Sequence, residues 1–405
     1  MRTALRSTVV RRFALAELLL QVQFWFPIWF VFLRDLGFSF GIIVLADALF
    51  RLTVVVCEIP LGMLTDRVGR RGAYLALSAL TGLTFVAITT VRSTPVLMGV
   101  WLLWGVQWAA ASGLGQAYLV EAVREHAPSV GVVPAFGVVR AAAGLTGTLS
   151  LASAGVLYGV DPRLPFLVTA ACAMAALLVI ATLPRVTTSL RARQQSHSTR
   201  WQRGALREIG EDRALVRRMI AAGLVLLYGW SATLLFQPLV LDEGMDEQAA
   251  AWMFTGFAAA GLVAGLVAPA VVRALGNAAV AGGFGLMVVA SAGVALGSGP
   301  TAVLFVPLMG LGYYGALTIS EATVSGSART SYRATALSVV SSAAGLAIAA
   351  ARPVLGSVAD ARSTEVAFAV WAVVGGVLLL VLVGLLRTGV REVPVEAEPS
   401  RLARP

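Results

Sequence analysis

The chain has 405 residues, of which 58% are hydrophobic and 13% are charged, and its mean hydropathy is +0.83. Because an ordinary soluble domain is about 25% charged, this composition excludes a soluble protein and indicates a membrane protein with many spans. The formal charge is +10, all positive side chains other than histidine are arginines, and the basic excess lies in the loops of one membrane face, so no nucleic-acid partner is expected. Two scattered cysteines and two histidines exclude a disulfide framework and a metal cluster, and no cofactor or metal is expected.

Twelve apolar stretches each approach the ~20 residues that a helix needs to cross a hydrocarbon core of ~30 Å. They predict an all-α polytopic membrane protein whose spans cover residues 13–33, 40–61, 72–91, 95–119, 132–158, 163–183, 217–240, 249–272, 278–297, 302–324, 334–358 and 365–386. A long polar segment separates the sixth span from the seventh. We therefore expect a six-helix half at 1–183, a central loop at 184–216, a second six-helix half at 217–386 and a tail at 387–405.

Apolar residues alternate with charges over residues 204–218 of the central loop. This pattern predicts a short helix on the membrane surface. A disordered linker is the alternative for the same residues.

The arginines are unequally divided between the two membrane faces. With both termini cytoplasmic, four arginines lie in outer loops and three lie within spans, which leaves 24 of the 31 on the cytoplasmic side. The acidic loop at 242–247 then lies outside. Because positively charged loops mark the cytoplasmic face, we expect a multi-pass protein of the plasma membrane (a bacterial inner membrane), with both termini in the cytoplasm.

A short charged connection, GMLTDRVGRR at residues 62–71, joins the second span to the third. Its glycines permit a close approach of helix ends or a sharp turn, and its arginines alone would fit a short cytoplasmic loop. The complete order of residues resembles the signature loop between helices 2 and 3 of the major facilitator superfamily. The matching positions include Gly62, Asp66, Arg67, Gly69, Arg70 and Arg71.

The resemblance implies contacts at the cytoplasmic side that hold the outward-facing state together. In the family, the loop acid, here Asp66, docks against the start of helix 11, near Ala334. The arginine at Arg70 pairs with an acid at the end of helix 4, which is Glu121 here. An anion at a helix N-terminus is favoured by the free N–H groups and the helix dipole. We expect gating and structural roles for these residues.

An internal repeat supports two related halves. Residues 138–145 match residues 339–346 at six of eight positions, with an offset of 201. Parallel six-helix repeats describe the two halves of the superfamily, so the resemblance implies its twelve-helix fold. The second half keeps Arg273 in the corresponding loop but lacks the acid, and Arg273 with Glu321 would be the counterpart of the first-half ion pair.

Ionisable residues within spans cost several kcal/mol unless they are paired or hydrated. Asp47, Arg51 and Glu58 share one face of the second span at about 100° per residue. One interpretation is an ion pair between Asp47 and Arg51, with Glu58 as a structural partner of the signature loop. The other makes Glu58 the acid that carries a coupled proton. The run EIPLG at 58–62 resembles the Glu-Ile-Pro-Thr-Gly run of one superfamily branch, and a drug or metabolite efflux-like branch is expected.

Two further ion pairs follow from the depth of charges. Arg140 in the fifth span and Glu17 in the first lie at similar depths near the cytoplasm, so we expect them to pair. Arg352 and Asp47 both lie in the outer halves of spans that face each other in the superfamily. We expect an Asp47–Arg352 latch that forms when the cavity faces inward, although Arg51 competes for the same acid. Asp47 and Glu17 are further candidates for proton coupling.

In the superfamily, helices 1, 4, 7 and 10 line the central cavity, and the resemblance implies the same here. The aromatic and amide residues of these spans predict a large, aromatic and weakly polar cavity, although each alone also fits ordinary packing. Trp29 instead fits an interfacial aromatic belt. The candidate substrate contacts are Gln21, Gln23, Trp25, Trp104, Gln107, Trp108, Tyr228, Trp230, Gln237, Tyr313 and Tyr314.

The sequence contains no nucleotide-binding motif and no catalytic constellation, so an enzyme is not expected. The resemblance implies a monomeric secondary transporter in the lipid bilayer that moves a small molecule by alternating access. Proton-coupled efflux of a lipophilic or amphipathic compound is the leading hypothesis, because the predicted cavity is aromatic. The fifth span lacks the Gly-Pro-Gly-Gly-type motif of drug antiporters. The alternatives are an uptake symporter or facilitator for a small polar metabolite, and a receptor or scaffold that does not transport.

Overall fold

The computed structural model describes residues 4, 6–112, 114–186, 199–328 and 333–387. In this part of the chain every regular element is a helix, which confirms the predicted all-α class. Eleven helical stretches of the described residues are long and apolar enough to cross a membrane. The predicted first span is not among them because its helix is broken.

The helices form two halves. The first half comprises α2 (Thr8–Leu20), α3 (Trp29–Asp35), α4 (Phe40–Val68), α5 (Arg70–Thr89), α6 (Thr94–Ala111), α7 (Leu114–His126), α8 (Val132–Val160) and α9 (Leu164–Ala181). The second half comprises α12 (Arg213–Ala232), the 3-10 turn η1 (Thr233–Leu235), α13 (Phe236–Asp242), α14 (Glu247–Leu275), α15 (Ala278–Leu296), α16 (Pro300–Ser327), α17 (Arg333–Ala361) and α18 (Thr364–Arg387).

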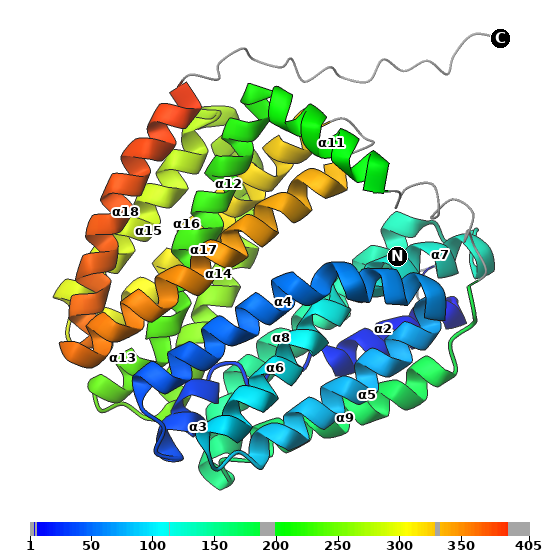
Figure 1. Cartoon of the computed structure of the whole chain (residues 1–405), viewed down its shortest axis with the longest axis horizontal. Coiled ribbons are helices and arrows are strands. Elements are labelled where there is room, and N and C mark those ends of the chain that lie inside the picture. The colour runs from blue at the N-terminus through cyan, green and yellow to red at the C-terminus, as the bar shows by residue number, and fades with distance from the viewer. Residues whose placement is uncertain (1–3, 5, 113, 187–198, 329–332, 388–405) are drawn as a thin grey trace.

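The halves contact each other through two long helix pairs, α4 with α17 and α8 with α14, and through α3 with α13. Figure 1 shows the halves meeting near α3 and α13 and diverging toward α7 and α11 (Thr199–Glu211). We call the first of these ends the closed end. The other is the motif end, because it carries residues 62–71.

Close packing at the closed end depends on two glycines. A Cβ atom added at Gly155 of α8 would lie 2.5 Å from the Cα atom of Gln248 on α14. A Cβ atom at Gly356 of α17 would lie 2.8 Å from Val44 Cγ2 on α4. Nearer the motif end of α8, a Cβ atom added at Gly137 would have no neighbour within 4 Å. The two halves therefore touch at the closed end and separate toward the motif end.

The predicted first span is not one helix, because the segment 21–28 between α2 and α3 is non-helical. Pro27 lacks a backbone N–H and cannot continue a regular helix here. The seventh span is also interrupted, because α12 passes through η1 before α13 begins. Each half therefore begins with an interrupted helix.

Gln237 of α13 supplies the hydrogen bonds that the first break lacks. Its Oε1 atom accepts the backbone N–H groups of Phe30 at 2.8 Å and Val31 at 3.3 Å. Its Nε2 atom donates to the carbonyl of Phe26 at 3.1 Å. Because hydrocarbon offers no partner to unpaired backbone groups, Gln237 stabilises the break and joins the second half to the first.

The signature motif is mostly helical, and the expectation of a ten-residue loop at 62–71 is wrong. α4 continues to Val68 and α5 begins at Arg70, so Gly69 alone connects them. Gly69 has φ +83° and ψ 149°, a backbone region that is essentially restricted to glycine. Arg71 donates to the carbonyls at the C-terminus of α9 and thereby fixes the turn against the sixth span.

The central loop contains α11 at Thr199–Glu211, which overlaps the helix predicted at 204–218 and begins before it, so a disordered linker is wrong for 204–211. Its position on the membrane surface stays a prediction. The helix ends before the predicted boundary, because Asp212 begins a new helix. The Oδ1 atom of Asp212 accepts the N–H groups of Ala214 and Leu215, each at 3.0 Å, which is an N-cap.

The two motif glycines should respond oppositely to alanine. Gly69→Ala places a side chain at φ +83° and should destabilise the protein by ~1–3 kcal/mol. Gly62→Ala lies inside α4 with nothing within 4 Å of its Cβ, and should be neutral or stabilising by up to ~1 kcal/mol. Equilibrium unfolding of the purified full-length protein in mixed micelles measures both. A loss of stability in Gly62→Ala as large as that in Gly69→Ala would contradict the single-residue turn.

Gln237→Leu should destabilise the protein by at least ~2 kcal/mol, because it leaves three backbone groups unpaired in the membrane. Gln107→Leu is the matched control. Gln107 gives a single bond, from Nε2 to the Thr81 hydroxyl at 3.0 Å, and that hydroxyl still donates to the Leu77 carbonyl. We expect the control to lose ~1 kcal/mol or less. Equal losses in the same unfolding measurement would show that Gln237 does not stabilise the break.

Candidate functional site

A small aromatic pocket lies between the two halves beside the interrupted helices. Its free volume is about 40 Å³, enough for a few water molecules and too small for a substrate. Its charged lining residues are Asp47, Arg51 and Arg352. The rest of its wall, mostly tryptophan and phenylalanine, is formed by Trp25, Phe26, Trp29, Phe50, Trp104, Trp108, Trp230, Thr233, Leu234 and Phe254.

A second, larger cavity lies next to the aromatic pocket. We call it the motif-side cavity, because it lies along the part of α4 that leads to the signature motif. Its volume is about 370 Å³, within the range of small-molecule sites. Arg51 and Trp108 line both cavities. The other lining residues are Val54, Val55, Glu58, Ala111, Ser112, Ser341, Ser342 and Gly345.

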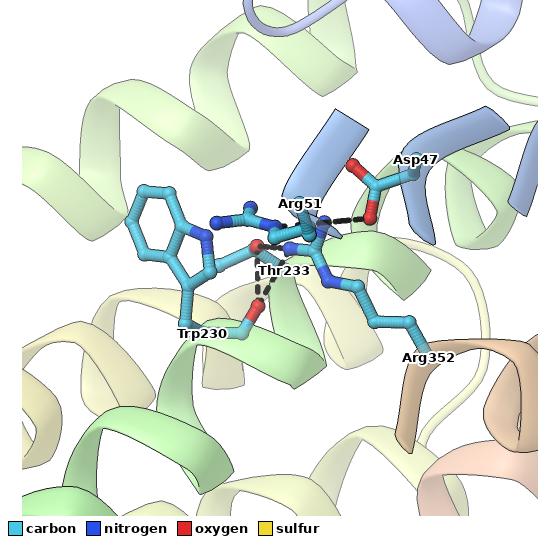
Figure 2. A network of polar contacts seen from close by, with 5 residues as sticks. All are labelled: Asp47, Arg51, Trp230, Thr233 and Arg352. Carbon is cyan, nitrogen blue, oxygen red and sulfur yellow. Dashed lines mark hydrogen bonds and ion pairs between the residues drawn. The ribbon is translucent and has the colours of Figure 1, made fainter. Parts of the chain in front are cut away.

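Arg352 of α17 is held by three acceptors. Its Nη1 atom donates to Asp47 Oδ2 at 2.7 Å, and its Nη2 atom donates to the carbonyl of Trp230 at 2.8 Å and to the hydroxyl of Thr233 at 3.0 Å (Figure 2). Arg352 and Asp47 are 3% and 5% exposed. The ion pair that charge depth predicts is therefore present and buried, and it connects the two halves. Removing one partner of such a pair costs ~3–5 kcal/mol, because it leaves a buried charge.

Arg51 lies beside this pair but is not closely bound by it. Its Nε atom is 3.9 Å from Asp47 Oδ2, compared with 2.7 Å for Arg352 Nη1. The guanidinium carbon of Arg51 lies 5.6 Å from the ring centre of Phe50 and 5.7 Å from that of Trp230. The predicted Asp47–Arg51 contact is thus the longer of the two ion pairs that Asp47 makes.

The three proton-coupling candidates lie in different surroundings. Glu58 lines the motif-side cavity, and its Oε1 atom accepts the hydroxyl of Ser112 at 3.1 Å. Asp47 lines the aromatic pocket. Glu17 lines neither cavity, and its carboxylate accepts a hydrogen bond from the Tyr74 hydroxyl. Glu58 is therefore the acid that shares a cavity of substrate size.

The predicted pairing of Glu17 with Arg140 is wrong. Glu17 Oε1 accepts the Tyr74 hydroxyl, and Glu17 Oε2 accepts from Gln21 Nε2 at 3.4 Å. Arg140 is exposed on α8, and no ion pair joins it to Glu17. Matching the depths of charges misses the true partner, because a tyrosine is a neutral donor.

Ion pairing at the motif end differs between the two halves. Arg70 Nε lies 2.8 Å from Glu121 Oε1, so the pair that the resemblance implies is present. Both residues belong to the first half, and the pair is formed while the halves are apart at the motif end, so it does not by itself hold the two halves together there. The ion pair predicted for the second half, between Arg273 and Glu321, is absent. Both side chains are exposed, and no ion pair joins them. Arg273 lies in the last turn of α14, where the helix dipole favours a positive charge without a side-chain partner.

The remaining motif residues have no described role in the site. Gly62 lies inside α4, and Arg67 is exposed in its last turn. The side chains of Asp66 and Ala334 lie outside the part of the chain that the structure describes. Their predicted docking therefore stays a prediction.

Four of the eleven predicted substrate contacts line the aromatic pocket, namely Trp25, Trp104, Trp108 and Trp230. Trp29 lines it as well and is 8% exposed. Its expected place in an interfacial belt is therefore wrong. Ring contacts continue through the wall, with the centres of Trp25 and Trp104 4.7 Å apart.

The other predicted contacts line neither cavity. The Tyr228 hydroxyl donates to Ser291 at 2.9 Å, and its ring stacks on Trp371, so this residue packs within the second half. Tyr313 and Tyr314 pack against Phe257. The side chain of Gln107 donates to the Thr81 hydroxyl, and the backbone N–H of Gln23 donates to the Ser150 hydroxyl.

Sequence reasoning missed several pocket residues. Phe50 follows Asp47 by three positions, so it shares the charged face of α4, and that spacing was the available signal. Phe254 and Thr233 carry no such signal, because the other half of the protein brings them to the pocket. Among the described residues, no three His, Cys, Asp or Glu side chains gather as a metal site requires.

Comparison with known proteins agrees with this arrangement. The family model described as Major Facilitator Superfamily matches residues 14–316. No curated protein has a sequence that matches this chain.

The fold resembles those of solved transporters. The nucleoside transporter NupG is 14% identical, with a TM-score of 0.76 over 94% of this chain and 100% of that one. A bacterial homologue of the human lysosomal transporter Spinster, in an inward-facing and occupied conformation, is 14% identical, with a TM-score of 0.73 over 95% and 96% of the two chains. A D-xylose–proton symporter is 14% identical, with a TM-score of 0.70 over 92% and 96%. At these identities the likeness concerns the fold. Together with the family match, it places the chain in the Major Facilitator Superfamily of membrane transporters.

Proposed function

We propose that this protein exports a lipophilic or amphipathic small molecule in exchange for protons, by alternating access between its two halves. The observation that carries the proposal is the asymmetry of the two cavities. The aromatic pocket is almost filled beside the Asp47–Arg352 pair, whereas the motif-side cavity has the volume of a small-molecule site. A molecule in the larger cavity lies against Arg51 and Trp108, which also line the pocket.

The arginine distribution supports a cytoplasmic motif end. On that orientation the structure corresponds to an inward-facing state, with the outer side closed by α4, α17, α8 and α14. The likeness to a homologue of Spinster in an inward-facing conformation is consistent with this assignment.

Uptake by symport is the second candidate, because the similar structures include a nucleoside transporter and a D-xylose–proton symporter. A site for a sugar or a nucleoside needs several converging hydrogen-bonding groups. The motif-side cavity has apolar walls at Val54, Val55, Trp108 and Ala111 beside Arg51, Glu58 and three serines. This division into apolar and polar parts favours an amphipathic substrate over a fully polar one.

We assign to the Asp47–Arg352 pair the role of an outer latch. Asp47→Asn should weaken it, because Arg352 then stays buried without a carboxylate partner among the described residues. In a background with Cys57 and Cys172 replaced by serine, a cysteine at position 44 is buried between the halves when the outer side is closed. Asp47→Asn should raise its labelling by an impermeant maleimide from outside about tenfold, which corresponds to ~1.4 kcal/mol.

Asp360→Asn is the control for this measurement. Asp360 is an exposed acid near the closed end of the same helix as Arg352, so its substitution should leave the labelling rate unchanged. A wild-type labelling rate in Asp47→Asn would contradict the latch.

Glu58 is proposed as the coupling acid. In proteoliposomes that contain a pH dye, a transported compound should dissipate an imposed proton gradient with the wild type and at least tenfold more slowly with Glu58→Gln. The compounds tested are lipophilic cations, neutral amphiphiles, organic acids, sugars and nucleosides. Glu17→Gln should retain coupling, since Glu17 lines neither cavity.

Loss of proton movement in Glu17→Gln with coupling intact in Glu58→Gln would move the coupling role to Glu17. Proton influx together with a sugar or nucleoside would establish uptake instead of efflux. Flux without proton movement would indicate a facilitator.

A further inference from the structure

The aromatic pocket carries a net positive charge. Two arginines and one carboxylate line it. Asp47 Oδ2 is 2.7 Å from Arg352 and 3.9 Å from Arg51, so the single carboxylate is matched mainly to Arg352. The charge of Arg51 is left largely unbalanced. An unbalanced cation in a site of low dielectric attracts an anion and repels a second cation.

The pocket also has an excess of hydrogen-bond donors. Four of its residues have a buried N–H group without an acceptor among the described residues: the Nε atoms of Arg51 and Arg352 and the indole Nε1 atoms of Trp104 and Trp230. Trp104 and Arg352 are 5% and 3% exposed. Buried polar groups are normally paired, and no lining residue of this pocket has an unpaired acceptor among the buried atoms without partners. A ligand that completes the site therefore brings acceptors, as a carboxylate does with its two oxygens.

Arg51 lies at the boundary between the two cavities. It lines both of them, and Figure 2 shows its guanidinium group beside the indole ring of Trp230. On its other side the motif-side cavity offers apolar walls at Val54, Val55 and Ala111, together with three serines. An acidic group bound to Arg51 would thus be attached to a body that lies in the cavity of about 370 Å³.

The other charged residue of that cavity, Glu58, forms no ion pair with Arg51 among the described contacts. It lies seven residues farther along α4, a rise of about 10 Å in a helix, and accepts the hydroxyl of Ser112 at 3.1 Å. A lipophilic cation is the rival ligand, because aromatic walls bind cations through their ring faces. Arg51 already occupies this position, with its guanidinium carbon within 5.7 Å of the ring centres of both Phe50 and Trp230.

We propose that the substrate of this transporter is an amphipathic organic anion, and that Arg51 binds its acidic group while its apolar body occupies the motif-side cavity. The inference rests on the proposed function, since it assigns a substrate class to the transport site. It makes Arg51 the residue that determines selectivity for charge.

The test compares ligands that differ only in charge. Benzoate, 2-naphthoate and octanoate are each measured beside the alcohol and the primary ammonium compound of the same skeleton. Binding is measured by thermal stabilisation of the purified full-length protein in nanodiscs, which rises with ligand concentration relative to Kd. We expect at least one carboxylate to bind tenfold or more tightly than both of its partners.

The variants locate the preference. Arg51→Gln should remove it, and Arg51→Lys should restore part of it, because the charge returns without the guanidinium fork. Arg140→Gln is the matched control, an exposed arginine that lines neither cavity, and should bind as the wild type does. If Arg51→Gln does not fold, the comparison of the three charge types on the wild type still decides the preference.

The proposal is overturned if no carboxylate binds more tightly than its alcohol, or if folded Arg51→Gln keeps the preference. The same compounds are then assayed for flux in proteoliposomes. Flux of neutral or cationic compounds alone would leave the proposed transport function standing and overturn the anion site. Carboxylate binding that depends on Arg51 but produces no flux would support the anion site and overturn transport.

Discussion

The breaks in the first and seventh spans leave backbone groups inside the membrane, and the need to pair those groups governs how the two halves are joined at the closed end. Hydrocarbon supplies no hydrogen bonds, so irregular backbone at this depth persists only where protein groups satisfy it. Gln237 satisfies the break between α2 and α3 from the opposite half. Arg352 satisfies the interruption after α12 and continues to Asp47 in the first half. The bonds that stabilise both breaks therefore also close one end of the protein.

The same breaks place the site. Trp25 and Phe26 belong to the non-helical segment of the first half, and Trp230 and Thr233 flank the interruption in the second. All four line the aromatic pocket, so its wall is formed where regular helix stops. This agrees with a general feature of transporters, whose binding sites lie at discontinuous helices between two repeats. Relative movement of the halves would change the contacts of these residues and with them the shape of the pocket.

Most of the helical organisation was predictable from hydropathy, because the spans other than the first are continuous apolar helices or helix pairs. The Asp47–Arg352 contact was predictable because a charge in a membrane needs a partner at the same depth and because the family resemblance implies that helices 2 and 11 face each other. The non-helical segment 21–28 was not predictable from hydropathy, because the residues on either side of it are as apolar as those of any span. Pro27 was the single residue that indicated a break. The partner of Glu17 was missed for a related reason. Tyr74 is neutral, and counting charges favoured Arg140, which is exposed.

The sharing of Asp47 between two arginines suits a protein that alternates between states. Arg352 belongs to the second half, whereas Arg51 is one helical turn from Asp47 and moves with it on α4. When the halves separate at the closed end, Asp47 loses Arg352 but keeps Arg51 at hand, so its charge is not left unpaired in the membrane. Arg352 retains Trp230 and Thr233 within its own half. In the proposed cycle, an anion bound to Arg51 competes with Asp47 for that arginine and leaves Asp47 to Arg352. An occupied inward-facing site would then strengthen the closed outer side until the anion departs.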